Sequence, residues 1–320
     1  MKIFLTGGTG FIGSHIAEAL LAQGYGLRLS IRPSSNKAYL NYKFIDWRYV
    51  DLSKPQPIES DLLKDISVVI HNAGITRAKE SESFFLVNEK ASLNLAEAAV
   101  KAGVEQFIFI SSLAARGPDQ RQSLGDMPSS DYGSSKLSAE KALIDFCQGT
   151  GMKLSILRLA GVYGPRDRDL LSLFQMANQG FLALPPKQGR LQPLYVSDAV
   201  AAVLAAINHK ASSGPWLIAE SKNYTWQEVG LLMEQALGKK LKRLHLNSSV
   251  FTFVAFLSGL WGKLSGQEVK LDMRRADDLS RYTFTGSVLD SEAALNWHAQ
   301  IALSEGLKLT AEWYQKQGWL

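Results

Sequence analysis

Eight residues near the start of the chain decide its fold: Thr6-Gly7-Gly8-Thr9-Gly10-Phe11-Ile12-Gly13. They follow an apolar run, Lys2–Thr6, that predicts a strand, and they open a helical pattern over Ile12–Gln23. A glycine-rich turn between a first strand and a first helix is the context in which glycine spacing predicts a phosphate-binding site.

Three glycines in this turn, Gly7, Gly10 and Gly13, have the spacing G-x-x-G-x-x-G, a variant of the dinucleotide fingerprint. The first permits the tight turn, the second lets a pyrophosphate approach the backbone, and the third lets the helix pack against the sheet. The helix N-terminus supplies free N–H groups and a positive dipole end to the phosphate. The turn therefore predicts a dinucleotide site made of Gly7, Thr9, Gly10, Phe11, Ile12 and Gly13.

Strand-like and helix-like segments alternate over the first two-thirds of the chain. Five segments with little polar alternation, as expected of buried parallel strands, are Lys2–Thr6, Leu27–Ile31, Val68–His71, Phe107–Ser111 and Leu154–Leu159. The helical stretches between them are Ile12–Gln23, Ser83–Ala102 and Tyr132–Gln148. This alternation predicts an α/β fold, a doubly wound parallel sheet of the Rossmann type with helices on both faces.

The rhythm changes after about Tyr163, where proline pairs and irregular helices begin. We expect residues 1–165 to form the dinucleotide-binding domain and residues 166–320 to form mostly a smaller C-terminal substrate-binding domain. A segment near residues 190–220, including a helix over Val196–Asn208, is expected to return to the main domain.

Composition excludes several other classes of protein. The formal net charge of +5 is small for 320 residues and the basic residues are scattered, so no nucleic-acid partner is expected. The single cysteine, Cys147, excludes an internal disulfide and fits a reducing compartment. The apolar stretch Val250–Trp261 has about twelve residues, fewer than the roughly twenty of a membrane span. We expect a cytoplasmic protein whose partner is a small-molecule substrate.

The end of the second predicted strand indicates the cofactor. An acidic residue there would bind the ribose of NAD, whereas an arginine accommodates the 2′-phosphate of NADP. The sequence continues from Ile31 into Arg32, with Ser34 and Ser35 close by and no acid. Arg32 therefore favours NADP, and NAD remains the alternative.

A tyrosine and a lysine, Tyr132 and Lys136, stand four residues apart on a predicted helix, so both lie on one face. Free tyrosine has a pKa near 10, and a neighbouring ammonium lowers that pKa toward the range of a usable general acid or base. Ser111 and Ser112 end a preceding strand, at the sheet edge where such folds bind ligands. A serine there can hydrogen-bond the substrate oxygen while the tyrosine transfers its proton.

The motifs together resemble the extended short-chain dehydrogenase/reductase family, the NAD(P)-dependent epimerases and dehydratases. The resemblance covers nearly the whole chain and is carried by the glycine turn, Asn72-Ala73-Gly74, Ser111-Ser112, Tyr132-x-x-x-Lys136, Arg158–Asp167 and Tyr195–Ala199. It implies a Rossmann domain, a smaller substrate domain and a catalytic serine, tyrosine and lysine.

The resemblance also implies roles for individual residues. The catalytic set falls on Ser112, Tyr132 and Lys136, with Ser112 preferred over Ser111 because it lies five residues before Gly117. Asp51 and Leu52 are expected near the adenine, Ala73 and Gly74 beside the phosphates and ribose, and Lys136 at the nicotinamide ribose. Two departures are Arg116 before Gly117, where the family has tyrosine, and Ala160, where it usually has proline.

Arg32 makes the chain similar to the dihydroflavonol-reductase and hydroxysteroid-dehydrogenase branch, which implies hydride transfer between the cofactor and a small ketone or alcohol. The alternative is a nucleotide-sugar epimerase or dehydratase that recycles its bound cofactor, since such enzymes share every motif above. A non-catalytic dinucleotide-binding regulator is disfavoured by the complete catalytic set. The apolar Val250–Trp261 favours the first reading, whereas Arg274, Arg275 and Arg281 support the second.

Other polar residues have structural interpretations. The five histidines show no metal-ligand spacing, so no metal site is expected: His15, His71, His209, His245 and His298. The basic run Lys239–Arg243 is interpreted as a solvated turn, and Arg166–Asp169 either line the cleft or cap the next helix. By the resemblance, the helices over Ser83–Ala102 and Tyr132–Gln148 pair across a two-fold axis, which predicts a homodimer.

Overall fold

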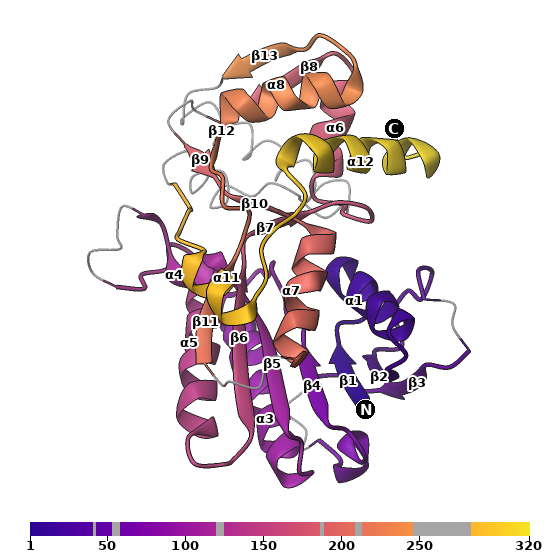
Figure 1. Cartoon of the computed structure of the whole chain (residues 1–320), viewed down its shortest axis with the longest axis vertical. Coiled ribbons are helices and arrows are strands. Elements are labelled where there is room, and N and C mark those ends of the chain that lie inside the picture. Colours follow the sequence, from indigo (N-terminus) through magenta and orange to yellow (C-terminus); the bar gives the residue numbers. More distant parts are fainter. Residues whose placement is uncertain (41–42, 53–57, 120–124, 186–188, 209–212, 246–282) are drawn as a thin grey trace.

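A seven-stranded parallel sheet, with strand order β11-β6-β5-β4-β1-β2-β3, is the centre of the molecule (Figure 1). The computed structural model describes the chain except residues 41–42, 53–57, 120–124, 186–188, 209–212 and 246–282. The strands of this sheet are β1 (Lys2–Thr6), β2 (Gly26–Ile31), β3 (Asp46–Tyr49), β4 (Val68–His71), β5 (Gln106–Ser112), β6 (Lys153–Leu159) and β11 (Ser213–Ile218). The order runs outward in both directions from β1 and β4, the switch point at which such sheets bind ligands. The Rossmann-type fold that the sequence predicts is confirmed.

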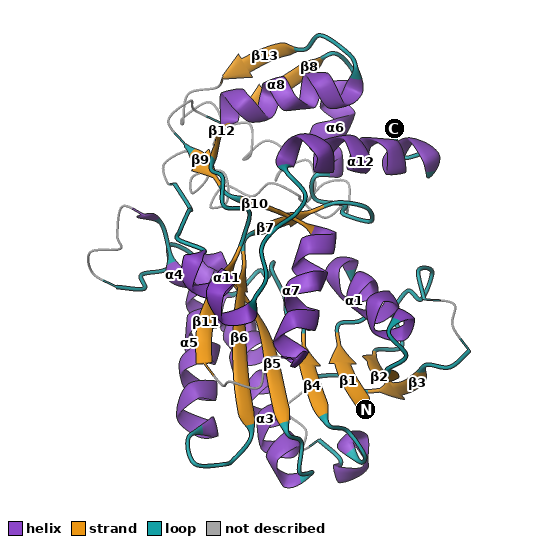
Figure 2. Ribbon diagram, in the orientation of Figure 1, coloured by secondary structure: helices purple, strands orange, loops and turns teal. Residues whose placement is uncertain are grey.

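Helices cover both faces of the sheet (Figure 2). On one face lie α1 (Phe11–Ala22), α7 (Val196–Asn208) and α11 (Leu289–Leu295), and on the other lie α3 (Ala91–Lys101) and α5 (Asp131–Cys147). Alternate residues of one strand enter different cores: Ile3 packs under α1 and α7, whereas Phe4 packs under α3 and α5. Because both faces are covered, the strands are apolar almost throughout.

A second lobe lies beyond the carboxyl ends of the strands (Figure 1). Its helices are α6 (Leu171–Asn178), α8 (Trp226–Leu237) and α12 (Leu303–Lys316), and its core includes Phe174, Met233 and Tyr314. Its strand pairs are β8 (Phe181–Leu184) with β13 (Lys242–His245), and β9 (Arg190–Leu191) with β12 (Tyr224–Thr225). Between the lobes β7 (Gly161–Tyr163) pairs with β10 (Pro193–Tyr195). The structure places α7, β11 and α11 with the main sheet, whereas the boundary near residue 165 stays a prediction.

The predicted helix over Ser83–Ala102 is wrong as a single element. The chain forms α2 (Ser81–Phe85), a π-helical turn η2 (Leu86–Lys90) and then α3. The wider turn contains Asn88, whose side chain bonds both backbone groups of Ile75. Such π turns inside helices are frequent at functional sites.

Three further elements differ from the sequence-based expectations. Strands β3 and β11 form the two edges of the sheet and were not predicted, because β3 is polar and β11 contains Gly214 and Pro215. The solvated turn expected over Lys239–Arg243 is also wrong in part, since its last two residues begin β13 and pair with β8.

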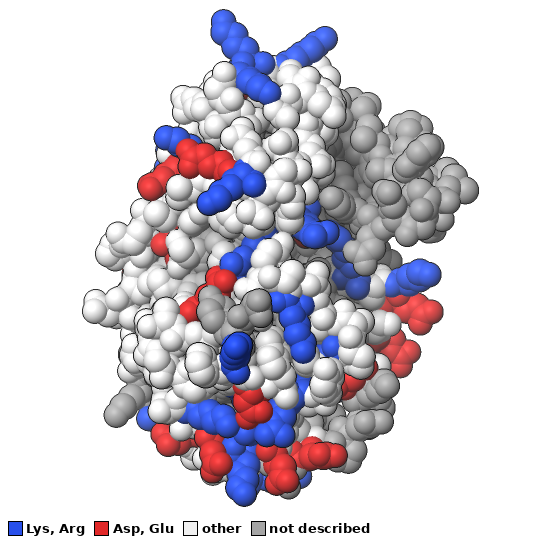
Figure 3. All heavy atoms as spheres, turned by 90° about the vertical axis from the view of Figure 1, so that its right-hand side faces the viewer, with Lys and Arg blue, Asp and Glu red and all other residues white. Residues whose placement is uncertain are grey.

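The surface carries charges of both signs. On the face shown in Figure 3, lysine and arginine side chains lie among aspartate and glutamate side chains, most densely at its lower end. Within the described part of the chain, the helices are too short or too polar to span a bilayer. The apolar stretch Val250–Trp261 and the arginines Arg274, Arg275 and Arg281 lie outside the described residues.

Candidate active site

The glycine turn joins β1 to α1 as the sequence predicts. Gly7 has a φ of +67°, and its carbonyl accepts the Gly10 N–H at 3.1 Å. A Cβ atom at Gly13 would lie 2.1 Å from the Gly7 carbonyl oxygen, so this position excludes any side chain. At Gly10 a Cβ would lie 3.3 Å from the same oxygen. Because Gly10 is exposed, a ligand can approach its backbone from outside. Gly10 precedes α1 without a side-chain cap, which leaves helix N–H groups for an anion.

The other predicted residues of the turn surround this N-terminus. Thr9 lies between the glycines, and Phe11 and Ile12 form the start of α1, all three partly exposed. The backbone of Ala73 follows β4 and lies against the turn, since a Cβ at Gly7 would be 2.9 Å from the Ala73 nitrogen. The structure therefore brings the turn and the Ala73-Gly74 segment together at one sheet edge.

The residues after β2 and β3 lie along the same edge. Arg32 follows β2 and is exposed, and its backbone N–H donates to the Ser35 hydroxyl at 2.9 Å. Asp51 and Leu52 follow β3 and are partly exposed. Arg28 has a different role: it is buried and donates from Nε to Asp46 at 2.7 Å. Arg28 therefore belongs to the structural core, and Arg32 is the arginine of this pair that faces solvent.

Tyr132 and Lys136 lie one turn apart at the start of α5. The Ser130 hydroxyl caps this helix by accepting the Gly133 N–H at 3.1 Å. Tyr132 is partly exposed, and its ring lies 6.4 Å from that of Phe84. Lys136 is buried and donates from Nζ to the Ile110 carbonyl at 2.9 Å. Burial lowers the pKa of Lys136 to about 8, and the carboxylate of Glu140 acts in the opposite direction.

The two serines that end β5 have different surroundings. Ser111 is buried and its hydroxyl donates to the Glu140 carboxylate. Ser112 is partly exposed and caps the short helix α4 (Leu113–Arg116), its oxygen accepting the Ala114 N–H at 3.2 Å. That bond leaves the Ser112 proton for another acceptor. The alternation of the strand thus favours Ser112 over Ser111 as a residue that reaches a substrate.

A buried charge cluster that the sequence analysis missed lies behind this set. Arg158 donates to Glu140 from Nη2 at 2.6 Å and from Nε at 3.0 Å, and to Asp126 from Nη2 at 2.7 Å. The spacing of Glu140 four residues after Lys136 was a visible signal. The contact with Arg158 depends on the packing of α5 against the sheet, for which local sequence holds no signal.

The backbone hydrogen bond of Ala160 gives a physical reason for alanine at the position where the family usually has proline. Its backbone N–H donates to the Ile218 carbonyl at 3.0 Å and so continues the pairing of β6 with β11. A proline has no N–H and would lose this bond.

The residues Arg166–Asp169 connect the segment after β7 to neighbouring elements. Arg166 has a φ of +72° and donates to Glu18 at 2.7 Å and to Ser14 at 3.0 Å, which joins this loop to α1. The Asp167 carboxylate accepts the backbone N–H groups of Asp169 and Leu170 and so holds the turn that precedes α6. The cap of α6 itself is Leu170 without a side-chain bond, so the expected capping of the helix by these residues is wrong.

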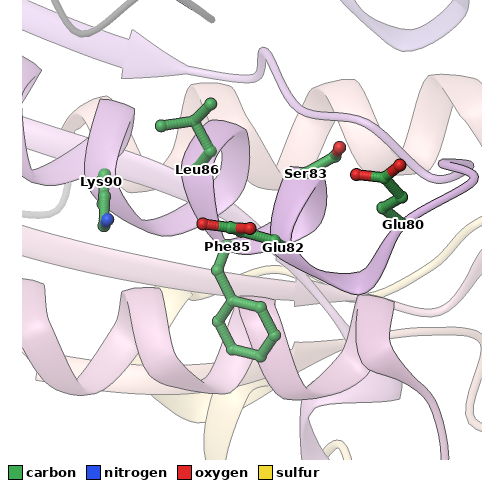
Figure 4. A pocket seen from close by; sticks show the side chains of 6 residues that line it. All are labelled: Glu80, Glu82, Ser83, Phe85, Leu86 and Lys90. Atoms are coloured by element: carbon green, nitrogen blue, oxygen red, sulfur yellow. The ribbon is translucent and has the colours of Figure 1, made fainter.

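The histidines and the cavities give no second site. In the described part of the chain no cluster of three metal-ligating side chains is present. His15 contacts the Pro165 carbonyl at 3.0 Å, while His209 and the His245 side chain lie outside the described atoms. A surface cavity of about 260 Å³ (Figure 4) is lined by none of the expected site residues but by Glu80, Glu82, Ser83, Phe85, Leu86 and Lys90.

The fold and the motifs define an oxidoreductase-type enzyme of the extended short-chain dehydrogenase/reductase superfamily. A family model described as the NAD dependent epimerase/dehydratase family matches residues 3–219. The chain belongs to this family, as the sequence resemblance predicts, and it is an enzyme, an oxidoreductase or an epimerase.

Several known proteins are similar to the chain over almost its full length. A ceramide reductase of Caulobacter vibrioides is 29% identical over 321 residues, covering 99% of this chain and 96% of the relative. A UDP-glucose 4-epimerase of Vibrio cholerae is 28% identical, covering 97% and 94%. The solved UDP-glucuronic acid 4-epimerase from Bacillus cereus, in complex with UDP-glucuronic acid and NAD, has a TM-score of 0.77 at 22% identity, covering 99% and 100%. This structure shows the shared fold.

Proposed function

We propose that the enzyme uses a bound NAD to oxidise a secondary alcohol of a nucleotide sugar and then returns the hydride, as an epimerase or dehydratase does. The observation that carries the proposal is the position of Tyr132 one turn before the buried ammonium of Lys136, on the sheet edge that bears the glycine turn. The family model and the UDP-sugar epimerases among the relatives support this alternative better than the dihydroflavonol-reductase reading.

The residues present fit a dinucleotide. Gly7, Gly10 and Gly13 form a side-chain-free cradle at the start of α1, which suits a pyrophosphate. Gly74 has the same property, since a Cβ there would lie 2.9 Å from Asn88 Oδ1 and 3.3 Å from Lys136 Nζ. We assign the phosphates to the turn, the adenosine to the side of Arg32, Asp51 and Leu52, and the nicotinamide ribose to Ala73, Gly74, Tyr132 and Lys136.

The catalytic residues divide the proton chemistry among them. When bound, the nicotinamide supplies the hydride acceptor and donor. Tyr132 takes the proton of the substrate hydroxyl and later returns it. Lys136, whose pKa is near 8, is mostly an ammonium at neutral pH and stabilises the phenolate form of Tyr132. Ser112 donates a hydrogen bond to the substrate oxygen and holds it beside the tyrosine.

The cofactor assignment differs from the preference that Arg32 predicts. The family description and the NAD in the neighbouring solved structures support NAD, whereas they give no support for NADP. Arg32 is the residue that we expect a 2′-phosphate to contact, so direct measurement of NADH and NADPH binding distinguishes the two cofactors.

A second candidate is the reduction of a long-chain ketone. It is favoured by the similarity to the ceramide reductase, which covers 99% of this chain, and by Arg32 in place of an acid after β2. In this reaction Tyr132 donates the proton to the carbonyl oxygen, and one reduced nicotinamide would be oxidised for each ketone that becomes an alcohol.

We also propose a cytoplasmic homodimer. Helix α5 presents Ile144 with 36% of its surface exposed, and the neighbouring α2 and η2 carry the cavity of Figure 4. These elements overlap the two helical stretches, Ser83–Ala102 and Tyr132–Gln148, that were expected to pair across a two-fold axis. Light scattering at micromolar concentration tests this, and a mass of one chain contradicts it.

The two candidate reactions leave different traces in one assay. The purified enzyme is incubated with UDP-glucose, UDP-galactose, UDP-glucuronic acid or dTDP-glucose, and the sugar is followed by proton NMR while nicotinamide absorbance is recorded. Conversion of a sugar without net absorbance change supports the recycling enzyme. Stoichiometric loss of NADPH or NADH with the ketone form of a ceramide, and no sugar conversion, overturns it in favour of the reductase.

A further inference from the structure

A buried hydrogen-bond network lies behind the glycine turn. His71 ends β4 and is 1% exposed, with its ring 5.8 Å from that of Phe109 and 6.0 Å from that of Phe107. Its Nδ1 lies 2.7 Å from the Thr6 hydroxyl oxygen, and its Nε2 lies 2.8 Å from the Ser92 hydroxyl oxygen. The ring therefore joins the last residue of β1 to the first turn of α3.

The neighbouring bonds fix the direction of each hydrogen bond. The Thr6 oxygen accepts the Ala73 N–H at 3.0 Å, so its own proton is available for Nδ1 of His71. The Ser92 hydroxyl donates to the Asn88 carbonyl at 2.6 Å, so its oxygen accepts from Nε2 of His71. Nε2 of His71 therefore carries a proton, and in the neutral ring Nδ1 is bare and accepts the Thr6 hydroxyl. Burial and the Lys136 ammonium lower the pKa of His71 to about 3, which agrees with a neutral ring.

Both ends of this hydrogen-bond network lead to the same backbone segment. At one end Thr6 holds the Ala73 N–H. At the other end the Asn88 side chain accepts the Ile75 N–H at 2.9 Å and donates to the Ile75 carbonyl at 3.0 Å. Gly74 lies between these anchors and against Lys136. Asn88 also donates to Ser135 at 3.0 Å, next to the lysine on α5.

We propose that His71 is a positioning residue, which, as a neutral ring of fixed orientation, holds residues 73–75 against Lys136 so that the segment fits the nicotinamide ribose. The placement at the ribose rests on the proposed function, whereas the orientation of the ring does not. A histidine that only filled the space between two phenylalanines would need neither hydroxyl. The two roles are therefore separable by experiment.

The first test measures the tautomer directly. Protein labelled with ¹⁵N-histidine is recorded by long-range ¹H–¹⁵N NMR from pH 5 to 8, and His71 is assigned by the loss of its signals in His71→Gln. We expect a protonated Nε2, a bare Nδ1 and no titration across this range. A proton on Nδ1, or a ring that titrates, overturns the proposal whatever reaction the enzyme catalyses.

The second test measures NADH affinity by fluorescence titration in a double-mutant cycle. Thr6→Val and Ser92→Ala each remove the hydrogen bond on one side of the His71 ring. Each is therefore expected to weaken NADH binding about tenfold. The double variant is expected to bind NADH no more weakly than either single variant, because one substitution already interrupts the hydrogen-bond network. Thr6→Ser and Ser92→Thr restore the hydroxyls and should recover affinity.

The outcomes separate the possible failures. Losses of affinity that add in the double variant, or a fall in melting temperature with unchanged NADH affinity, show a packing residue and overturn the proposal. If the unaltered enzyme binds no nicotinamide dinucleotide, the proposed function fails, while the NMR measurement still decides the orientation of His71.

Discussion

Glu140 lies one helical turn after Lys136 on α5, and the two side chains are both buried, with 1% and 4% of their surfaces exposed. The carboxylate of Glu140 accepts the Ser111 hydroxyl and two nitrogens of Arg158. Arg158 in turn reaches Asp126 at 2.7 Å. Lys136 is therefore close to a carboxylate that also forms an ion pair with the buried Arg158. Two carboxylates and two cations balance one another behind the site.

This arrangement predicts how the pH profile responds to Glu140→Gln. The Glu140 carboxylate favours the ammonium form of Lys136, so its removal should lower the Lys136 pKa further below about 8. If turnover needs the ammonium, the fall of kcat at high pH should begin roughly one pH unit lower. The measurement is kcat against pH from 6 to 10 on the substrate identified by the panel.

The control for this variant is Glu312→Gln on α12, an exposed glutamate whose side chain is 57% accessible. It should leave the profile unchanged. Arg158 keeps Asp126 as a partner in Glu140→Gln, which limits the loss of stability. An alkaline limb that stays in place, or moves upward, contradicts a role for Glu140 in the charge of Lys136.

The glycine turn offers a matched pair of substitutions. In Gly13→Ala the new Cβ would lie 2.1 Å from the Gly7 carbonyl, so the β1–α1 junction must open and the melting temperature should fall by several degrees. In Gly10→Ala the same oxygen lies at 3.3 Å, so the fold should tolerate the methyl while a pyrophosphate loses its approach. Thermal melts and NADH titrations measure both effects. Gly10→Ala with unchanged NADH affinity would place the pyrophosphate elsewhere.

Much of the sheet could be predicted from the sequence because its central strands are buried on both faces and read as continuous apolar runs. The edge strands β3 and β11 could not be predicted in this way, because β3 is polar and β11 contains Gly214 and Pro215. The π turn around Asn88 has no local signature either. It is stabilised by Ile75, thirteen residues earlier in the loop after β4.

The candidate site divides in the same way. The glycine turn and the spacing of Tyr132 and Lys136 are local patterns, and the structure brings them to one sheet edge. The partners of Glu140 come from β5 and β6, and the partners of His71 come from β1 and α3. Contacts of this kind depend on strand order and on how the helices pack, so periodicity and motif spacing do not predict them.

The exposed position of Arg32 predicts which cofactor it affects. Arg32→Ala should raise the dissociation constant for NADPH about ten- to a hundredfold, because a charge-assisted contact to the 2′-phosphate is lost, roughly 1.5–3 kcal/mol. Binding of NADH should change little. Isothermal titration with both cofactors checks this, with Arg48→Ala, an exposed arginine on β3, as the control. Equal weakening of both cofactors would show that Arg32 does not contact that phosphate.

The last prediction concerns the chemistry. Tyr132→Phe should lower kcat by roughly 10²–10⁴-fold, the usual contribution of a general acid or base, and should leave NADH affinity intact. The loss should fall on kcat rather than on KM, because the hydroxyl acts mainly in the transition state. Lys136→Met should be comparably damaging and should also weaken cofactor binding, since its ammonium serves both the phenol and the ribose.

The neighbouring serines provide the internal control for this prediction. Ser112→Ala should reduce kcat less than Tyr132→Phe, since it removes a hydrogen bond to the substrate but no proton carrier. Ser111→Ala should instead lower the melting temperature, because the buried Glu140 carboxylate loses a donor. A larger fall in kcat for Ser111→Ala than for Ser112→Ala would reverse the assignment of the catalytic serine. Near-normal turnover by Tyr132→Phe would remove the tyrosine from the reaction and leave a dinucleotide-binding protein without this catalytic set.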